Sequence, residues 1–350
     1  MGRFVCILVL AAVILSCSKE NGGGVDGPNQ ESGVGMAFAP ALLWPDYNVS
    51  NSSQTRASNS LVNDSDDLKS SNILLLATAS RGSDILPVFN NQPLSFTDGA
   101  WSYAPIKYWF PRLKYTFGAF WPSTLSNSSI TSTGTDDAPI LQITDYITGK
   151  TNSFDARSED LLYASYTRDN TYTSDYSAVP LQFNHLLACV SFHIRNTTDT
   201  DIIHIKGIEL VGHQYMCDIN VGISSAVLTP DSDDVVDSVE ENYFDGEDRV
   251  GTTESPFLPK AMTEEQFEPL FDCENLTVLP QTVFGKGVQL KFTIYYEDAD
   301  PVVYTGNLSS IESIPAWEQG KKYRYNITIS SENIYFQLVE VPWIEHEIEL

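Results

Sequence analysis

The sequence lacks an apolar run long enough to cross a membrane. Its longest run, Phe4 to Leu15, has about a dozen residues, whereas a transmembrane helix needs roughly 20. A basic residue, Arg3, precedes the run, which is typical of a secretory signal. We therefore expect the protein to be exported.

The end of this signal, Ile14-Leu15-Ser16-Cys17, resembles a bacterial lipobox. We expect cleavage between Ser16 and Cys17, since the signal peptidase needs a small side chain before the cut, and Cys17 would then carry lipid such as palmitate. An ordinary signal with a chance cysteine is the alternative. Residues 1–16 are interpreted as a lipoprotein signal peptide. Residues 17–35, rich in Gly, Asn and Ser, are interpreted as a flexible tether that reaches about 23 Å.

Basic residues are scarce. The chain has 20 Lys and Arg against 46 Asp and Glu, a formal net charge of −26. Removal of residues 1–16 takes away one positive charge, that of Arg3, and gives −27. This acidity argues against binding to nucleic acid or to anionic lipid and favours solubility outside the cell.

Cysteines are few, and motifs for catalysis are missing. The three cysteines after Cys17, which are Cys189, Cys217 and Cys273, allow at most one disulfide, and their spacing matches no metal motif. The sequence contains no Gly-x-Ser-x-Gly, no His-Glu-x-x-His, no phosphate-binding glycine loop and no Cys-x-x-Cys. We therefore expect no enzyme activity, no cofactor and no metal.

Two groups of residues have side chains of the types that bind metal ions. Three histidines on or near adjacent predicted strands, and four aspartates in an acidic stretch, carry suitable atoms. Neutral histidines and solvated acidic loops are the commoner interpretation of such groups, and the aspartates lack the regular spacing of a calcium loop. These residues are His185, His193 and His204, and Asp231, Asp233, Asp234 and Asp237.

Short alternating runs, separated by Gly, Pro, Asn and Asp, predict an all-β fold. Leu186 to Arg195 alternates apolar and mainly polar residues, as a half-buried strand does. Further strands are predicted at 73–77, 203–210, 276–279, 288–296 and 323–329. Residues 101–120 are predicted to form an aromatic-rich hairpin region with Pro111 in its turn.

One short helix, Thr263–Phe271, is also predicted, and the acidic stretch 231–248 is expected to be an exposed loop. The polar residues 169–175 suggest a boundary between two tandem β-sandwich domains, 36–178 and 179–350.

Several segments in order resemble the fimbrillin family, the lipoprotein pilins of type V pili and their accessory subunits. Each is weak alone, and together they cover about residues 55–345. The stretch from Val179 to Phe192 is the most specific, although Cys189 stands where the family often has lysine. The others are Thr55-Arg56-Ala57, Trp101 with Lys107-Tyr108-Trp109, Tyr115-x-Phe117-x-Ala119 with Pro122, Asp160–Ala164, Leu279-Pro280-Gln281, and Trp317-x-x-Gly320-Lys321-x-Tyr323-x-Tyr325.

The resemblance implies two transthyretin-like β-sandwich domains and assembly by exchange of strands between subunits. Family members are cut after an arginine by a trypsin-like surface protease, which frees a first strand and opens an apolar groove for another subunit's strand. Arg56–Ala57 is the expected cut, after the apolar segment Met36–Trp44, and Arg81 is the alternative. An ordinary first strand followed by an incidental arginine remains possible.

The C-terminal residues alternate as a donor or edge strand would. The apolar members of this candidate donor strand are Val339, Val341, Trp343, Ile344, Ile348 and Leu350. If this strand folds back onto its own domain, the protein would instead be an anchor or a non-polymerising accessory subunit.

The sequence thus predicts a structural or adhesive pilus subunit, an outer-membrane lipoprotein on the cell surface. Its partners would be other fimbrillin-like subunits, with a host protein or glycan as a possible target. A glycan-binding surface lipoprotein is the alternative function, since Trp101, Tyr103, Tyr108 and Trp109 could stack on sugars, although their alternation favours packing in a core. An uncharacterised hydrolase is a third possibility, without a nominated residue.

Overall fold

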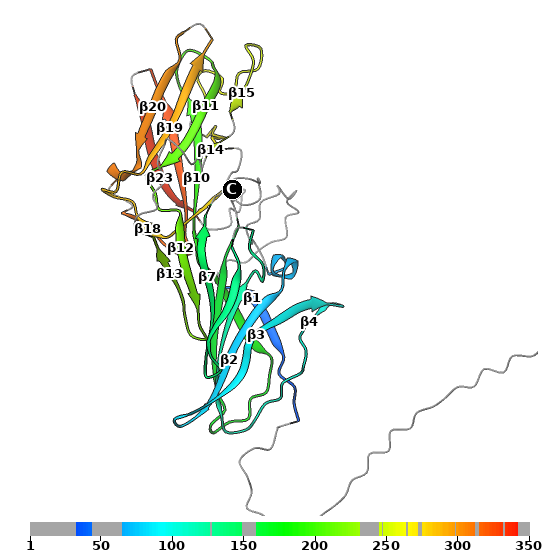
Figure 1. The fold of residues 1–350 in the computed structure, drawn as a ribbon. Helices are drawn as coiled ribbons and strands as arrows, with labels where there is room; N and C mark the ends of the chain where they lie inside the picture. The colour runs from blue at the N-terminus through cyan, green and yellow to red at the C-terminus, as the bar shows by residue number, and fades with distance from the viewer. Residues whose placement is uncertain are drawn as a thin grey trace, which may run out of the picture.

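The structure is a computed structural model. It describes residues 33–43, 65–126, 128–148, 159–231, 245–246, 248–263, 265–271, 275–297, 299–311, 315–331 and 333–341. The predicted signal peptide, Cys17, most of the tether and Arg56 lie outside these ranges. The described residues are almost entirely β, which confirms the predicted fold class (Figure 1). Beside the strands they contain two short 3-10 turns, η1 (Asp67–Ser70) and η3 (Leu308–Ser310).

Two sheets that face each other contain the strands of the first half of the chain together with β9, β12 and β13. The larger sheet has seven strands and the smaller has four. In the larger sheet the strands lie in the order β1 (Phe38–Leu42), β9 (Val179–His185), β8 (Leu162–Asp169), β5 (Lys114–Trp121), β2 (Ile73–Arg81), β3 (Asp84–Thr97) and β4 (Ala100–Ser102). In the smaller sheet the order is β13 (Ala226–Pro230), β12 (Met216–Val221), β7 (Ala138–Ile147) and β6 (Ile130–Thr135).

The second half supplies two further five-stranded sheets. Their strands are β16 (Glu268–Pro269), β10 (Ala188–Asn196), β22 (Lys322–Ile329) and β23 (Ile334–Val341), with β17 (Leu276–Val278) beside β10; and β14 (Asp245–Gly246), β11 (Ile202–Val211), β19 (Gln289–Tyr296) and β20 (Val302–Asn307), with β15 (Arg249–Val250) beside β11. A small pair, β18 (Gln281–Thr282) and β21 (Ala316–Trp317), completes the set. Figure 1 shows β10, β11, β19, β20 and β23 together at one end of the molecule and β1–β4 at the other.

Alternation along each strand explains where the cores form. In β2, Leu74 and Leu76 point into the core shared with β7 and β12, while Ile73 and Leu75 point to the opposite face. Because both faces are covered, β2 is apolar throughout its first five residues. A separate core lies between the two sheets of the second half and includes Phe192.

The pairing of strands does not divide the chain at 178/179. β9 lies in the first sheet between β8 and β1, and β12 pairs with β7 in the second. Residues 179–185 and 216–230 therefore belong with the N-terminal sheets, while β10 and β11, which lie between them in the sequence, belong with the C-terminal ones. A run of alternating residues identifies a strand but carries no information on which sheet it joins.

The predicted helix at 263–271 is wrong. The residues described in this range form no helix. Glu268 and Pro269 instead form β16 beside β10, and the amide of Leu270 donates to the carbonyl of Phe192 at 2.8 Å. Pro269 has no N–H to donate and disfavours a helix interior, which explains the result. No helix in the described part of the chain is long and apolar enough to cross a membrane.

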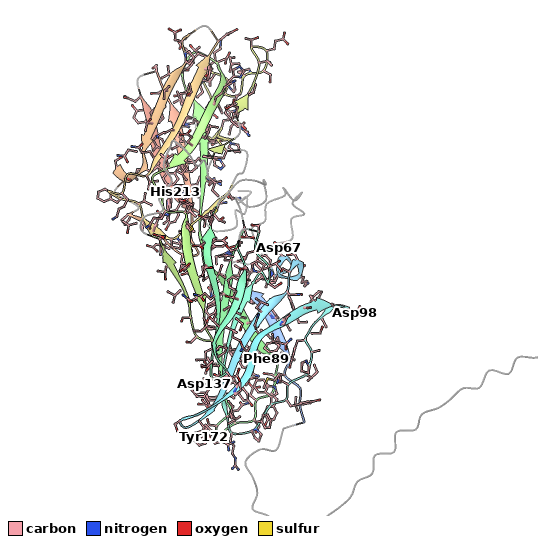
Figure 2. All side chains as sticks on the ribbon, viewed as in Figure 1. Asp67, Phe89, Asp98, Asp137, Tyr172 and His213 are labelled. Atoms are coloured by element: carbon pink, nitrogen blue, oxygen red, sulfur yellow. The ribbon has the colours of Figure 1, made fainter. Side chains whose placement is uncertain are left out.

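Two histidines, His193 in β10 and His213 between β11 and β12, should make stability depend on pH. Burial lowers the pKa of His213 to about 3 (Figure 2), and burial with the charges of Arg324 and Lys322 lowers the pKa of His193 to about 4. In the unfolded chain a histidine titrates near pH 6.5, so below that pH the unfolded chain binds more protons. The free energy of unfolding should therefore fall as the pH is lowered from about 6.5 towards 4, by up to about 1.4 kcal/mol per pH unit for each histidine.

Urea unfolding at several pH values between 7.5 and 4.5 measures this slope, and His213→Gln is the control that should reduce it. The carboxyl group of Glu159, whose pKa burial raises, opposes the loss. Equal slopes in the parent protein and His213→Gln would contradict the role given to His213.

Candidate functional site at the first strand

The first strand is held by backbone hydrogen bonds to two other segments. β1 runs parallel to β9, from Phe38 opposite Val179 to Leu42 opposite Phe183. Before β1, the amide of Met36 donates to the carbonyl of Lys107 at 2.8 Å. The amide of Trp109 donates in turn to the carbonyl of Val34 at 3.1 Å. Residues 34–43 thus occupy a slot between β9 and segment 107–109, which we call the β1 slot.

Side chains of this segment alternate between the core and the surface. Met36, Phe38 and Leu42 are buried, whereas Val34 and Leu43 are exposed. Burying one such side chain contributes about 1.5–3 kcal/mol, so the three together contribute about 5–9 kcal/mol. The predicted apolar segment Met36–Trp44 is therefore confirmed as a strand over 38–42.

Phe38 lies at the centre of this apolar contact. Its ring packs edge-on against three aromatic rings from β3, β5 and the segment after β4. The ring centroids are 5.8 Å from Phe89, 5.9 Å from Phe117 and 5.6 Å from Tyr103. Phe89, labelled in Figure 2, comes from a strand on the far side of the sheet order from β1. The seven-stranded sheet therefore curls so that its two sides meet around Phe38.

Tyr103 also contacts the main chain of the slot. Its hydroxyl donates to the carbonyl of Met36 at 3.1 Å and accepts from the amide of Lys107 at 3.3 Å. Burial raises the pKa of this phenol, so it stays protonated as a donor. A contact to the main chain is independent of the side chains that a strand in the slot carries.

The expected cut lies just after this strand in the sequence. Arg56 and Ala57 are outside the described residues. The described residues on the two sides of them are in contact, because the amide of Leu42 donates to the hydroxyl of Ser65 at 3.1 Å. A cut at Arg56 would leave β1 bound only by noncovalent contacts.

The alternative cut, Arg81, lies in a different setting. It is the last residue of β2, which pairs with β3 on one side and with β5 on the other. Its guanidinium donates to the carbonyls of Pro111 at 3.2 Å and Arg112 at 3.4 Å. A cut there would separate β1 and β2 together, and β2 is an interior strand of the sheet.

The candidate donor strand at the C-terminus is placed in part. Val339 pairs with Arg324 and Val341 with Lys322, in β23 along β22 of their own chain. β23 has β22 as its partner within the described residues and so forms an edge. Trp343, Ile344, Ile348 and Leu350 lie outside the described residues. The part of the candidate donor segment that the structure describes is therefore already paired within the chain.

The four aromatic residues proposed to stack on sugars do not form one exposed surface. Tyr103 and Trp109 are buried in the N-terminal core. Trp101 packs against Phe96 at 5.3 Å, and Tyr108 is 39% exposed. The core interpretation thus holds for Tyr103 and Trp109.

The possible metal ligands and the cysteines are likewise dispersed. His185 Nδ1 lies 2.8 Å from a carboxylate oxygen of Asp160, whereas His204 packs against Tyr295. Within the described ranges, no three His, Cys, Asp or Glu side chains gather into a possible metal site. Cys189 and Cys217 are buried, and the thiol of Cys189 donates to the side-chain oxygen of Asn275 at 3.9 Å. Cys273 and the aspartates Asp233, Asp234 and Asp237 are outside the described residues.

A family model described as fimbrillin-like matches residues 55–343. The chain belongs to the fimbrillin-like family. This match covers the strands from β2 to β23 and confirms the resemblance found in the sequence. Membership of a family described as fimbrillin-like supports a role for this chain as a subunit of a cell-surface fimbrium.

One solved structure shows the same fold at low sequence identity, and others are similar to the chain. A fimbrial protein from Bacteroides vulgatus is 17% identical with a TM-score of 0.55, over 78% of this chain and 93% of that one. A candidate cell adhesion protein from Bacteroides ovatus is 15% identical with a TM-score of 0.46, over 91% and 100% of the two chains. No curated protein matches the fimbrillin-like chain.

Sequence reasoning missed two participants in the slot, segment 107–109 as a hydrogen-bonding partner and Tyr103 as a contact to the main chain. The pattern of aromatics around Trp109 marked a core, but no local signal reports which distant backbone a strand will pair with.

Proposed function

We propose that this chain is a subunit of a cell-surface pilus, exported as a lipoprotein through Cys17 and assembled by exchange of its first strand. In this scheme a protease cuts after Arg56, β1 leaves, and a strand of another subunit enters the β1 slot. Main-chain hydrogen bonds and pockets for alternate side chains would then be remade with the new strand. Fimbrillin-like subunits are the partners this function requires.

One observation carries the proposal: the strand before Arg56 is paired with β9 and 107–109 and is not needed to connect any other strand. Its loss would remove the hydrogen-bond partners of the Phe183 carbonyl and of the Val179 amide, and would open the apolar pocket that holds Phe38. An open, apolar edge of this kind is a template for another strand.

The cut at Arg56 is favoured over that at Arg81 for an energetic reason. Removal of β1 exposes three buried side chains, whereas removal of β2 as well would expose seven consecutive buried residues, 73–79, in the middle of the sheet. The seven-stranded sheet would not be expected to persist after that loss.

The pairing of β23 favours a second candidate, a non-polymerising anchor or accessory subunit. Val339 and Val341 are already paired within the chain, so the donor would have to come from residues 342–350 or from β23 after it detaches. An anchor would accept a strand without donating one.

Cells that express the protein with Arg56→Ala or Arg81→Ala test the proposal. The unchanged protein should yield a shed form that begins at Ala57 and forms detergent-resistant ladders, with Arg81→Ala behaving in the same way. Arg56→Ala should keep the N-terminus at lipidated Cys17 and give no ladders. N-terminal sequencing and electrophoresis without heating measure both, and ladders from Arg56→Ala would contradict the proposed cut.

A further inference from the structure

Arg168 in β8 is a buried cation beside the β1 slot. Its side chain is 4% exposed. The guanidinium donates to the carbonyls of Ser177 at 2.5 Å and Ala178 at 3.2 Å, and to the Ser177 hydroxyl at 3.2 Å. Asp175 lies 3.5 Å from its Nε and supplies the opposite charge. Arg168 thereby fixes the residues immediately before β9.

The other contacts of this guanidinium are to aromatic rings. It lies 5.1 Å from the ring of Trp109 and 5.4 Å from that of Tyr166, within the range of cation–π attraction. Trp109 is fully buried, and its backbone amide donates to the carbonyl of Val34. One side chain thus contacts both walls of the slot, the start of β9 and segment 107–109.

The contacts of Arg168 to Ala178 and to Trp109 both lie next to backbone groups that form hydrogen bonds with the first strand. Ala178 precedes Val179, whose amide donates to the carbonyl of Ala37 at 2.8 Å. None of the hydrogen bonds, ion pairs or ring contacts described above for Arg168 involves residues 33–43. They therefore do not depend on the strand that occupies the slot.

The geometry points to Arg168 as the positioning residue that keeps the two walls of the β1 slot at strand spacing when the slot is empty. This inference rests on the proposed exchange of the first strand. An incoming strand gains its hydrogen bonds only if both walls are already in place, because ordering a loop during binding costs conformational free energy. The planar fork of an arginine can bond two carbonyls and stack on a ring at the same time, which a lysine cannot.

An empty slot can be obtained in the full-length chain with Phe38→Asp. This substitution would place a carboxylate among the rings of Phe89, Tyr103 and Phe117, so the resident strand should leave the slot. A labelled peptide with the sequence of residues 33–45 is the probe, and the same peptide carrying the Phe38→Asp change is the negative control.

The association rate of this peptide is then compared in three chains that all carry Phe38→Asp. Addition of Arg168→Met should slow association about tenfold, because the walls must be ordered as the peptide binds. Addition of Arg195→Met should leave the rate unchanged. Arg195 is a matched control, since it donates to Thr328 at 2.9 Å and lies 4.9 Å from the Phe267 ring, away from the slot.

Thermal unfolding of each chain separates positioning from stability. We expect the two arginine variants to lower the melting temperature to a similar extent while only the Arg168 variant slows the peptide. Arg168→Lys keeps the positive charge but lacks the planar guanidinium, so it should also slow association of the peptide. This variant replaces Arg168→Met in the comparison if Arg168→Met does not fold. If the peptide associates at the same rate with and without the Arg168 change, the role of Arg168 is overturned while the proposed strand exchange stands. The same holds if Arg195→Met slows association as much as Arg168→Met. Failure of the Phe38→Asp parent to bind the peptide would overturn the exchange of the first strand itself.

Discussion

Replacing Phe38 with alanine should lower the free energy of unfolding by about 3–5 kcal/mol. The ring is 7% exposed and packs against three other rings, so its removal leaves a cavity lined by side chains from β3 and β5 that cannot collapse independently. Edge-on ring pairs contribute beyond the area they bury. Urea unfolding followed by circular dichroism measures this change.

The control for this substitution is Ala39→Ser in the same strand. Ala39 is exposed, so the free energy of unfolding should change by less than about 0.5 kcal/mol. A loss from Phe38→Ala no larger than that of the control would show that β1 contributes little to the stability of the fold.

Hydrogen exchange adds a readout of the strand itself. The amides of Met36 and Leu43 donate to the carbonyls of Lys107 and Phe183, so they exchange when β1 leaves the slot. In Phe38→Ala these two amides should exchange faster by a larger factor than amides in β2. A strand that detaches locally is what exchange between subunits requires.

Replacing Gly118 with alanine should destabilise the protein by about 3 kcal/mol. Gly118 lies in β5, on the face that meets the turn after β12. An added Cβ would lie 2.4 Å from the carbonyl oxygen of Gly222 and 2.8 Å from the Cα of Ile223. These are backbone atoms, so the contact can be relieved only by moving one sheet away from the other.

The same contact offers its own control from the opposite side. A Cβ at Gly222 would have the Ser225 carbonyl oxygen at 3.6 Å as its neighbour, an ordinary van der Waals distance. Gly222→Ala should therefore change the free energy of unfolding by less than about 1 kcal/mol, with part of any loss offset by the reduced freedom of the unfolded chain. Equal losses at the two glycines, measured by urea unfolding, would mean that the sheets can separate without cost.

Local patterns were sufficient to predict many of the strands. The alternation of Leu186 to Arg195 gives β10, and the run of buried residues at 73–77 gives β2. The predicted helix at 263–271 does not form because Pro269 lacks the N–H that a helix interior needs, and Glu268 and Pro269 form β16 instead. The family was also accessible from the sequence, because its short motifs occur in order along the chain.

Partners in space were not accessible in the same way. Segment 107–109 and β9 are separated from β1 by more than 60 residues, and their pairing depends on how the seven-stranded sheet curls. No local pattern in the sequence marks Arg168, and only the folded chain places Trp109 and Ala178 on its two sides. The return of residues 216–230 to the first pair of sheets is a further case.

The sequence by itself determined the all-β fold class, the excess of negative charge, the family, and the apolar character of the segment before Arg56. Each of these depends on composition or on residues that are neighbours along the chain. Only the tertiary structure decided that this segment lies between β9 and segment 107–109, and that the two ends of the curled sheet meet around Phe38. It also decided that β23 pairs with β22 of its own chain. The physical reason is that a β-strand leaves its hydrogen bonds unmade until another strand meets it, so the partner is selected by the fold as a whole.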